Sequence, residues 1–410
     1  MFGTDARRLA FRLIATASAA TAALSGLAGP ALAGETAAPA VGTIAGAGAA
    51  GAIAGSYIVV LDPASAGTSG VTSASQELVR AYGGTVVDDY SATIRGFHLR
   101  ASAEQARRIA ADPAVRYVEQ DATISTAGQQ AADVAWGTDR IDQQSLPLSN
   151  TYSYRSAADV TAYVIDTGIR TSHQEFAGRA ASGWDFVGND PVADDCHGHG
   201  THVAGTIGGA THGVAKDVKL VGLKVLGCDG LGSYADFVAA VDWVTEHAQR
   251  PAVANMSLGG EVSQALDEAV TRSIASGVTY TIAGGNEEQR ACDYSPGRTP
   301  AAITVGATDR TDRRAWFSNY GTCLDLFAPG ADIRSAGIAS DTAAETMSGT
   351  SMAAPHVAGA AALVLGAHPD WAPQQVRDDL VAHAGTGLVR NAGSGSPNLL
   401  LHTGHLIGAA

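Results

Sequence analysis

Hydrophobic and polar positions follow two different patterns along the chain. The first pattern covers residues 57–119, where short strand-like runs alternate with two amphipathic stretches. It predicts strands at 57–61, 85–90, 96–99 and 115–119 and helices at 74–82 and 103–111. The resulting order, β-α-β-β-α-β, is typical of a small α+β ferredoxin-like unit of about 70 residues.

The second pattern begins near Trp136, where continuous apolar runs alternate with longer helical stretches. Such runs are typical of a parallel sheet with helices on both faces, so we expect an α/β, doubly wound, mainly parallel sheet. In this architecture, sites form beyond the carboxyl ends of strands, near helix N-termini. The predicted strands are 160–165, 218–225, 253–256, 278–283 and 303–306, and the predicted helices are 234–247, 262–276, 351–365 and 373–383.

The N-terminal residues 1–33 have the composition of a secretory signal peptide. Three arginines precede an apolar, small-residue stretch at 13–27, and Ala-Leu-Ala at 31–33 fits a cleavage site. The alternative, a transmembrane anchor, is disfavoured because the stretch is short and rich in Ala, Ser, Thr and Gly. No later segment is predicted to span a membrane. Residues 34–55 are an Ala/Gly-rich linker that we expect to bury no core.

The chain has a net charge of −14 and no basic runs. This balance argues against nucleic acids and anionic membranes as partners.

Three glycine-rich segments each present one member of a possible catalytic set. They are V-I-D-T-G around Asp166, H-G-T-H-V-A-G from His199, and G-T-S-M-A-A-P-H-V-A-G around Ser351. A serine hydroxyl needs a nearby base to become nucleophilic, and that base needs an anion to fix its tautomer. The chain order Asp, His, Ser is that of the subtilisin type, and the G-x-S-x-G elbow of α/β-hydrolases is absent.

On these segments, the sequence from about residue 56 to the end resembles the subtilisin-like serine proteases, most closely the secreted proteinase K and aqualysin branch. The resemblance implies an inhibitory propeptide at 56–128 and a catalytic domain at 129–410, with the mature N-terminus near Gln129. The flexible, polar segment 125–133 suits a processing site. The alternative for the first unit is an unrelated accessory domain.

The resemblance makes Ser351 the nucleophile, His199 the general base and Asp166 the group that orients the base. A helix beginning at Ser351 would tolerate Pro355 in its first turn. His197, His199 and His202 could alternatively form a zinc site, although no H-E-x-x-H pattern occurs. We expect His202 to be structural and His197 to be solvated. His356 is expected to pack in the core.

Asn286 follows the segment ending A-G-G and is expected to donate to the oxyanion. Alone, it would equally suit a turn. Relatives usually have A-A-G-N, so Gly284 leaves the shape of the primary specificity pocket open.

The resemblance also implies a cleft that pairs with extended peptide backbone. Two segments match its edges, and glycine there permits close approach of a backbone. Tyrosines are expected at a distal subsite and near the primary pocket, although core positions are their general alternative. The predicted substrate-binding residues are Gly230, Leu231, Gly232, Ser257, Leu258, Gly259, Tyr234 and Tyr294.

Four cysteines in an exported chain favour disulfides, and sequence alone allows three connectivities. The resemblance to aqualysin implies Cys196–Cys228 and Cys292–Cys323. A reactive thiol at Cys196 is the alternative.

Structural calcium is implied by the resemblance alone, because no EF-hand pattern occurs. One site would use Asp325 with the carbonyls of Pro300 and Ala302. Oxygen ligands suit this hard cation. Ordinary surface carboxylates are the alternative. The second predicted site comprises Asp139, Asp142, Gln143, Ser149 and Thr151.

Together these inferences predict a secreted, monomeric, self-processed serine endopeptidase that acts on proteins and peptides and prefers apolar or aromatic residues before the cleaved bond. A narrow processing protease, a catalytically inactive binding relative and a serine esterase are the rival hypotheses.

Overall fold

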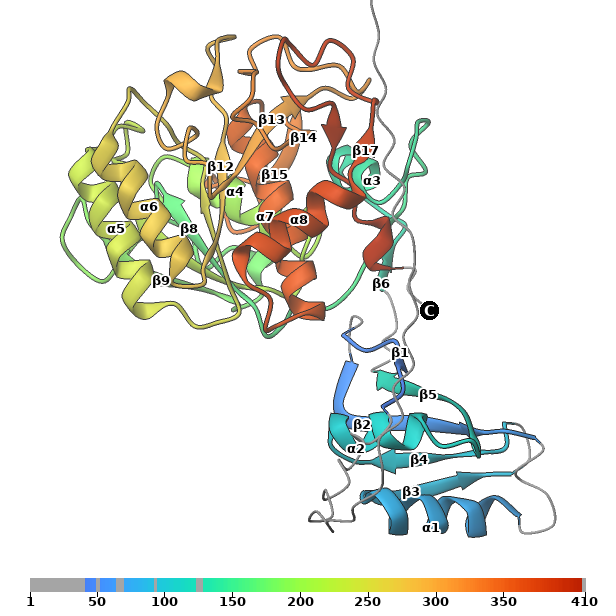
Figure 1. The fold of residues 1–410 in the computed structure, drawn as a ribbon. Coiled ribbons are helices and arrows are strands. Elements are labelled where there is room, and N and C mark those ends of the chain that lie inside the picture. The colour runs from blue at the N-terminus through green and yellow to red at the C-terminus, as the bar shows by residue number, and fades with distance from the viewer. Residues whose placement is uncertain (1–40, 49–51, 64–69, 92–93, 123–127, 408–410) are drawn as a thin grey trace, which may run out of the picture.

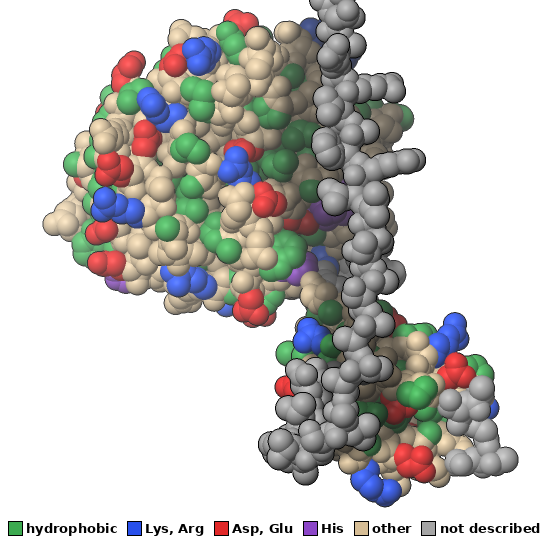
Figure 2. Space-filling view, viewed as in Figure 1, with side chains coloured by type: hydrophobic (Ala, Val, Ile, Leu, Met, Phe, Trp, Pro, Cys, Tyr) green, Lys and Arg blue, Asp and Glu red, His purple; other side chains and the backbone are tan. Residues whose placement is uncertain are grey.

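The computed structural model describes residues 41–48, 52–63, 70–91, 94–122 and 128–407, which form two units (Figure 1). The predicted signal peptide and residues 123–127, which include the start of the predicted processing segment, lie outside these residues. Figure 2 shows acidic and basic side chains interspersed over the visible face, without a continuous basic patch there.

The smaller unit has the predicted β-α-β-β-α-β order, with sheet order β1-β5-β2-β4-β3 and antiparallel pairing within β5-β2-β4-β3. Its core includes Val59, Phe97, Leu99 and Ile109. A capping box at Ser102 starts its second helix. The elements are β1 (Ile44–Ala45), β2 (Ala52–Leu61), α1 (Gly70–Tyr82), β3 (Thr85–Tyr90), β4 (Gly96–Arg100), α2 (Ala103–Ala110) and β5 (Val115–Ala122).

The prediction of a core-free linker at 34–55 is wrong for its second half. β1 pairs in parallel with β5, Ile44 packs against the small core, and β2 begins at Ala52. Backbone hydrogen bonds of a sheet need no large side chain, so Ala and Gly can extend it.

The larger unit is built on a nine-stranded sheet in the order β17-β18-β14-β13-β12-β11-β8-β10-β9. Its pairings are parallel except between β17 and β18. The doubly wound prediction is therefore confirmed. The strands are β8 (Thr161–Asp166), β9 (Ala180–Asp185), β10 (Lys219–Lys224), β11 (Ala252–Met256), β12 (Thr279–Ala283), β13 (Ile303–Thr308), β14 (Leu326–Pro329), β17 (Gly385–Thr386) and β18 (Leu399–Leu400).

Helices cover both faces of this sheet. In β8, Val164 belongs to the core shared with α4 and α7, whereas Tyr163 and Ile165 belong to the core shared with α5 and α6. Figure 1 shows α5 beside α6, and α8 beside α7. The helices are α3 (Trp136–Ile141), α4 (His199–Gly208), α5 (Tyr234–His247), α6 (Gln264–Ala275), α7 (Thr350–Ala367) and α8 (Pro373–His383).

Helix α7 runs through the centre of the larger unit. By length and composition it could cross a membrane, but 89% of it is buried inside the protein. A helix that is apolar all round is expected in such a core.

Several elements carried too little local signal to be predicted. These are short strands and single helical turns, together with β9, β14, α3 and α4. The remaining elements are β6 (Gly128–Gln130), β7 (Tyr152–Tyr154), β15 (Ile333–Ala336), β16 (Ala344–Met347), η1 (Gln174–Phe176), η2 (Ala291–Asp293) and η3 (Gly404–Leu406).

Both predicted disulfides are confirmed, and no free cysteine occurs in the described part of the chain. Cys196–Cys228 joins the loop before α4 to the loop that contains Gly230. The hypothesis of a reactive Cys196 thiol is therefore wrong.

Candidate active site

Strand β8 lies between β10 and β11 in the sheet. The strands β9 and β10 lie on one side of β8 and the strands from β11 onward lie on the other, so the order of the strands reverses at β8. Sites in doubly wound folds form at such a switch point. Asp166 is the last residue of β8 and is fully buried. His199 is the first residue of α4, and its Nδ1 lies 2.7 Å from Asp166 Oδ1. The structure thus brings together two of the three predicted catalytic side chains.

The buried Asp166 carboxylate controls the pKa of the His199 imidazole. Burial alone would lower the pKa of His199, but the negative charge and hydrogen bond of Asp166 outweigh it. The pKa of His199 is therefore raised above its usual 6.5. The proton on the Nδ1 side is held by the carboxylate, which leaves Nε2 as the atom able to exchange a proton.

Asp195, which sequence reasoning missed, accepts hydrogen bonds from residues next to Asp166 and His199 and so holds the two segments together. Its Oδ1 accepts hydrogen bonds from Gly198 N (2.8 Å) and Thr167 Oγ1 (2.9 Å). Its Oδ2 accepts bonds from Thr201 N and Oγ1. A carboxylate near the N-terminus of a helix would have been the signal for it, but α4 itself was not predicted. Asp195 is a positioning residue, since it joins the end of β8 to the start of α4.

Ser351 is the second residue of α7, where a backbone N–H has no intrahelical acceptor. Pro355 is the sixth residue of α7, so the prediction that it lies in the first turn is wrong. Proline cannot donate to the carbonyl four residues earlier, which is that of Ser351. Ser257 Oγ donates to this carbonyl instead, at 2.7 Å. The Ser257 side chain, just after β11, thus supplies the hydrogen bond that Pro355 cannot donate to the Ser351 carbonyl.

The Ser351 hydroxyl makes the reciprocal bond, donating to Ser257 O at 3.1 Å. Among the described residues, no hydrogen bond joins Ser351 to His199. Catalytic hydrogen bonds are often formed only when substrate is present, and a hydroxyl can rotate about one torsion.

Asn286 lies beyond the end of β12, beside the start of α7. Its Oδ1 accepts hydrogen bonds from Thr350 N (2.8 Å) and Thr350 Oγ1 (2.9 Å). Because its oxygen is used in this way, the amide group keeps its N–H donors for another acceptor. The residue is exposed and lines a cavity with Ser351. Thr350 is a second positioning residue that sequence reasoning missed.

The two predicted edge segments line one cleft of about 490 Å³, which also includes His199 and Tyr234. Leu231 projects into solvent and is 71% exposed. The prediction that glycine at 232 serves backbone approach needs revision. A Cβ there would lie 2.2 Å from Val225 O, so packing within the protein already requires glycine.

A smaller cavity of about 90 Å³ adjoins Ser351 and Asn286 and includes Tyr294 in its lining. Gly284 lines it too, but a Cβ on Gly284 would meet Leu324 Cδ2 at 2.7 Å and Val305 O at 3.0 Å. Neither group belongs to the lining, so this glycine relieves packing behind the cavity.

One acidic side chain, Glu287, also lines the small cavity and was missed by the sequence analysis. Its Oε2 accepts a hydrogen bond from Asn319 Nδ2 at 2.7 Å.

Among the described residues, the other histidines near His199 form no cluster of metal ligands. His202 is fully buried, and its Nε2 lies 2.9 Å from Ile333 O. Burial lowers the pKa of His202 to about 4. His356 is buried against Met352 O, as expected for a packing residue. His197 is exposed but lines the larger cleft.

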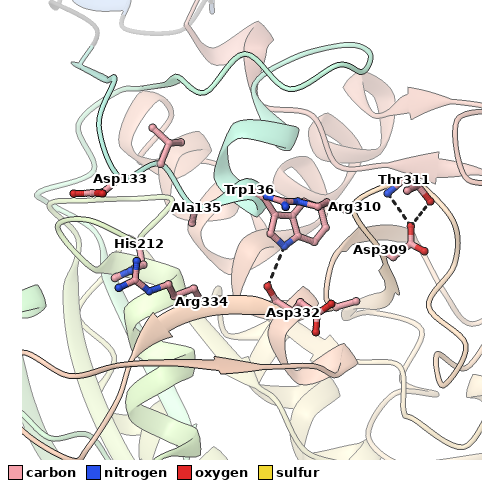
Figure 3. Close-up of a pocket in the computed structure, with 11 residues that line it drawn as sticks. Asp133, Ala135, Trp136, His212, Asp309, Arg310, Thr311, Asp332 and Arg334 are labelled. Atoms are coloured by element: carbon pink, nitrogen blue, oxygen red, sulfur yellow. Dashed lines mark hydrogen bonds between the residues drawn. The ribbon is translucent and has the colours of Figure 1, made fainter.

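Another hollow, of about 510 Å³, lies apart from these residues (Figure 3). Trp136 Nε1 donates to Asp332 O at 3.1 Å there, and Arg310 stacks over the indole. No proposed catalytic residue lines this hollow.

The predicted calcium ligands at Asp325 do not fit a calcium ion in this structure. The guanidinium of Arg377 donates to Asp325 Oδ1 and, at 2.7 Å, to Pro300 O. Thr304 N donates to the other carboxylate oxygen. A side-chain cation therefore takes the charge-balancing place predicted for the metal, and this part of the calcium prediction is corrected.

We expect Arg377→Gln to lower the free energy of unfolding by about 3 kcal/mol, because a nearly buried carboxylate loses its partner. Urea unfolding of protein inactivated at its active site, in chelator, measures this loss. Added calcium should restore part of it, since the freed oxygens can then bind a cation. The control Arg272→Gln breaks an exposed pair and should change little. Equal stability of wild type and Arg377→Gln would contradict the assignment.

The second predicted calcium set does come together. Asp139 Oδ1 accepts hydrogen bonds from Ser149 N and Oγ, and Gln143 Oε1 accepts from Ser149 N as well. Ser149 Oγ lies 2.9 Å from Thr151 Oγ1. Asp142 Oδ1 is buried and accepts no hydrogen bond from any described residue, and burial raises the pKa of Asp142 to about 6. An orphaned carboxylate oxygen beside several oxygen donors fits a missing cation.

The chain is similar to several known proteins. Residues 158–403 match the subtilase family, and residues 56–127 match the peptidase inhibitor I9 family. The chain is 50% identical over 344 residues to an extracellular serine proteinase of Thermus sp. (strain Rt41A), covering 84% of each protein. It is 51% identical over 317 residues to alkaline serine exoprotease A of Vibrio alginolyticus, covering 76% of this chain and 59% of that protein.

A solved structure, that of a cold-adapted subtilisin-like serine proteinase, shares 50% identity and a TM-score of 0.65. The match covers 66% of this chain and 99% of that one. The chain therefore belongs to the subtilase family of serine endopeptidases and carries an I9-type inhibitor unit before its catalytic domain.

Proposed function

We propose that this protein cleaves peptide bonds through an acyl-enzyme formed on Ser351, with His199 as general base and Asp166 as its orienting anion. The observation that carries the proposal is the 2.7 Å contact of a buried carboxylate with an imidazole at the switch point of the sheet. His199 Nε2 takes the Ser351 proton as Oγ bonds to the carbonyl carbon. The same proton then passes to the leaving amine as the C–N bond breaks, and water repeats the sequence to release the acid.

Two donors are proposed to stabilise the tetrahedral oxyanion. One is the Ser351 N–H at the start of α7, where the helix dipole also favours negative charge. The other is the side-chain N–H of Asn286, which the paired bonds from Thr350 orient. These donors are fixed before substrate arrives, so they need no reorganisation during the reaction.

Extended peptide is proposed to bind between the two edge segments and pair with their backbone. The side chain before the cleaved bond would enter the 90 Å³ cavity, which is lined by glycines, Leu258 and Ala283 together with polar residues. This supports a broad specificity with apolar or aromatic preference. Glu287 is the one observation that favours the rival, a processing protease that selects basic residues.

A panel of peptide nitroanilides that differ only in Phe, Leu or Lys before the cleaved bond tests this proposal. We expect kcat/KM to be highest for Phe or Leu, and activity to be abolished by a serine-directed organophosphate. Preference for Lys, lost in Glu287→Gln, would favour the processing protease. An inactive, organophosphate-resistant protein would favour the binding relative, and turnover of esters without amides would favour the esterase.

The matched inhibitor unit supports a proenzyme whose propeptide, residues 56–128, inhibits the catalytic domain at 129–410 until cleavage near Gln129. Gln129 lies in β6, which pairs with β7 of the catalytic unit. The signal-like residues 1–33 and the relative described as extracellular support export. We propose a secreted monomer that acts on proteins and uses no nucleic acid or membrane partner.

We further propose that Ca²⁺ binds Asp139, Asp142, Gln143, Ser149 and Thr151 as a structural ion. Chelation should then lower the melting temperature of the inactivated enzyme, because an ion that binds only the folded state stabilises it. Asp142→Asn should remove this calcium dependence, whereas Asp378→Asn, an exposed helix-surface change, should retain it. A chelator effect that is equal in wild type and Asp142→Asn would contradict the site.

A further inference from the structure

Two histidines and an aspartate meet at the C-terminal end of the fold, in residues the catalytic proposal does not use. Asp379 and His383 lie one turn apart on α8, so their side chains share a face. His405 comes from η3, near the last described residue. One ligand atom from each lies within 4.8 Å of the others.

Two of the three separations among these atoms are close to those within a metal's coordination shell. His405 Nε2 lies 3.0 Å from Asp379 Oδ2, and His383 Nδ1 lies 3.2 Å from Asp379 Oδ1. In a tetrahedral zinc site with bonds of about 2.0–2.1 Å, neighbouring ligand atoms are about 3.3 Å apart. Little movement of the carboxylate would therefore be needed.

The two imidazole rings are stacked, with centroids 4.0 Å apart and planes that differ by 6°. Because an imidazole binds a metal in the plane of its ring, one of the two rings must rotate before both can bind the same ion. His383 is the last residue of α8, and its side chain is 46% exposed. Its side-chain torsions can change so that its ring nitrogen turns toward an ion held by Asp379 and His405. Its exposure also leaves an entry path from solvent. Asp379 and His405 are each about 15% exposed and hold the inner side.

We propose that Asp379, His383 and His405 form a binding site for a divalent transition-metal ion of the Zn²⁺ class. Imidazole nitrogen is a ligand for such ions, whereas calcium sites use oxygen. Three protein ligands leave one tetrahedral position for water. The metal would replace the proton shared between His405 Nε2 and Asp379 Oδ2, and His383 Nδ1 would exchange its hydrogen bond to the Asp379 carbonyl for a bond to the metal.

The consequence of binding is structural. The ion joins α8 to the segment after β18, which otherwise contacts the rest of the fold through bonds such as Thr403 N to Ile141 O. Because all three ligands meet only in the folded chain, metal binding adds to stability.

The test uses the full secreted protein, inactivated at its active site and held in constant calcium. Zn²⁺ alone is titrated against a chromophoric chelator, and Co²⁺ is added separately to record the visible bands of a tetrahedral complex. The variants are His405→Gln, His383→Gln and Asp379→Asn. The matched control is His247→Gln, since His247 also ends a helix with Nδ1 bonded to the carbonyl four residues earlier.

We expect one tight Zn²⁺ per chain, a tetrahedral Co²⁺ spectrum and a higher melting temperature with Zn²⁺. Each cluster variant should weaken binding more than about tenfold, and His247→Gln should not change it. Absence of zinc binding, or equal affinity in wild type and His405→Gln, would overturn the proposal. The cluster would then be only a hydrogen-bonded helix end. These readouts do not depend on peptidase activity, so the proposal can fail independently of the proposed function.

Discussion

Ser351→Ala is expected to lower kcat for a peptide substrate by about 10⁶-fold. The change removes the proposed nucleophile but leaves its backbone N–H and the Asn286 contacts in place. Substrate binding should therefore persist while chemistry stops. The same variant should be secreted with its propeptide still attached, because cleavage near Gln129 is proposed to use the same site. Intact mass and N-terminal sequencing measure the second effect.

A control in the same segment separates chemistry from folding. Ser348 is exposed, and its hydroxyl accepts a hydrogen bond from Asp332 N. Ser348→Ala should process normally and keep activity within a few-fold. If purified Ser351→Ala released its propeptide unaided, self-cleavage by this site would be wrong. If it retained peptidase activity, the nucleophile assignment itself would fail.

Asp166→Asn is expected to have the next largest effect, a fall in kcat of about 10⁴-fold, because the amide favours the wrong imidazole tautomer. It should also change the pH dependence. In the wild type, the Asp166 charge raises the pKa of His199, and activity is lost as pH falls through that pKa because the base becomes protonated. Without this charge, burial dominates and lowers the pKa, so the acid limb of kcat/KM should move to lower pH.

A kcat/KM profile over pH, recorded with one nitroanilide substrate, makes this comparison. Asp194→Asn is a matched control, since it removes an exposed carboxylate close in sequence to Asp195. It should leave both kcat and the acid limb unchanged. An acid limb that stays in place in Asp166→Asn would show that another group controls it.

The sequence predicted the elements that carry chemistry because their signals are local. Continuous apolar runs identified β8 and β12, and Asp166 and Asn286 stand at or after the ends of these strands. Pattern could not predict the short strands β6, β15 and β16, since a strand of three or four residues is set by its partner. The boundary near residue 55 failed for a similar reason, because β1 exists only through its pairing with β5.

The functional details that sequence reasoning missed all depend on contacts between distant parts of the chain. Asp195 acts through Thr167 and α4, and Thr350 acts on Asn286 from 64 positions away. The sequence analysis did not predict that Glu287 lines the small cavity, because nothing in its local sequence shows which side chains line the same space.

By itself, the sequence determined the chain order of the proposed catalytic residues, the doubly wound sheet and the small unit before it, since residue type and hydrophobic period act over neighbouring positions. Only the tertiary structure decided that Arg377 balances Asp325 where calcium was expected, and that Ser257 bonds the carbonyl which Pro355 leaves free. Both outcomes join residues 52 and 94 positions apart. Such contacts depend on packing geometry, which a local pattern of residues does not encode.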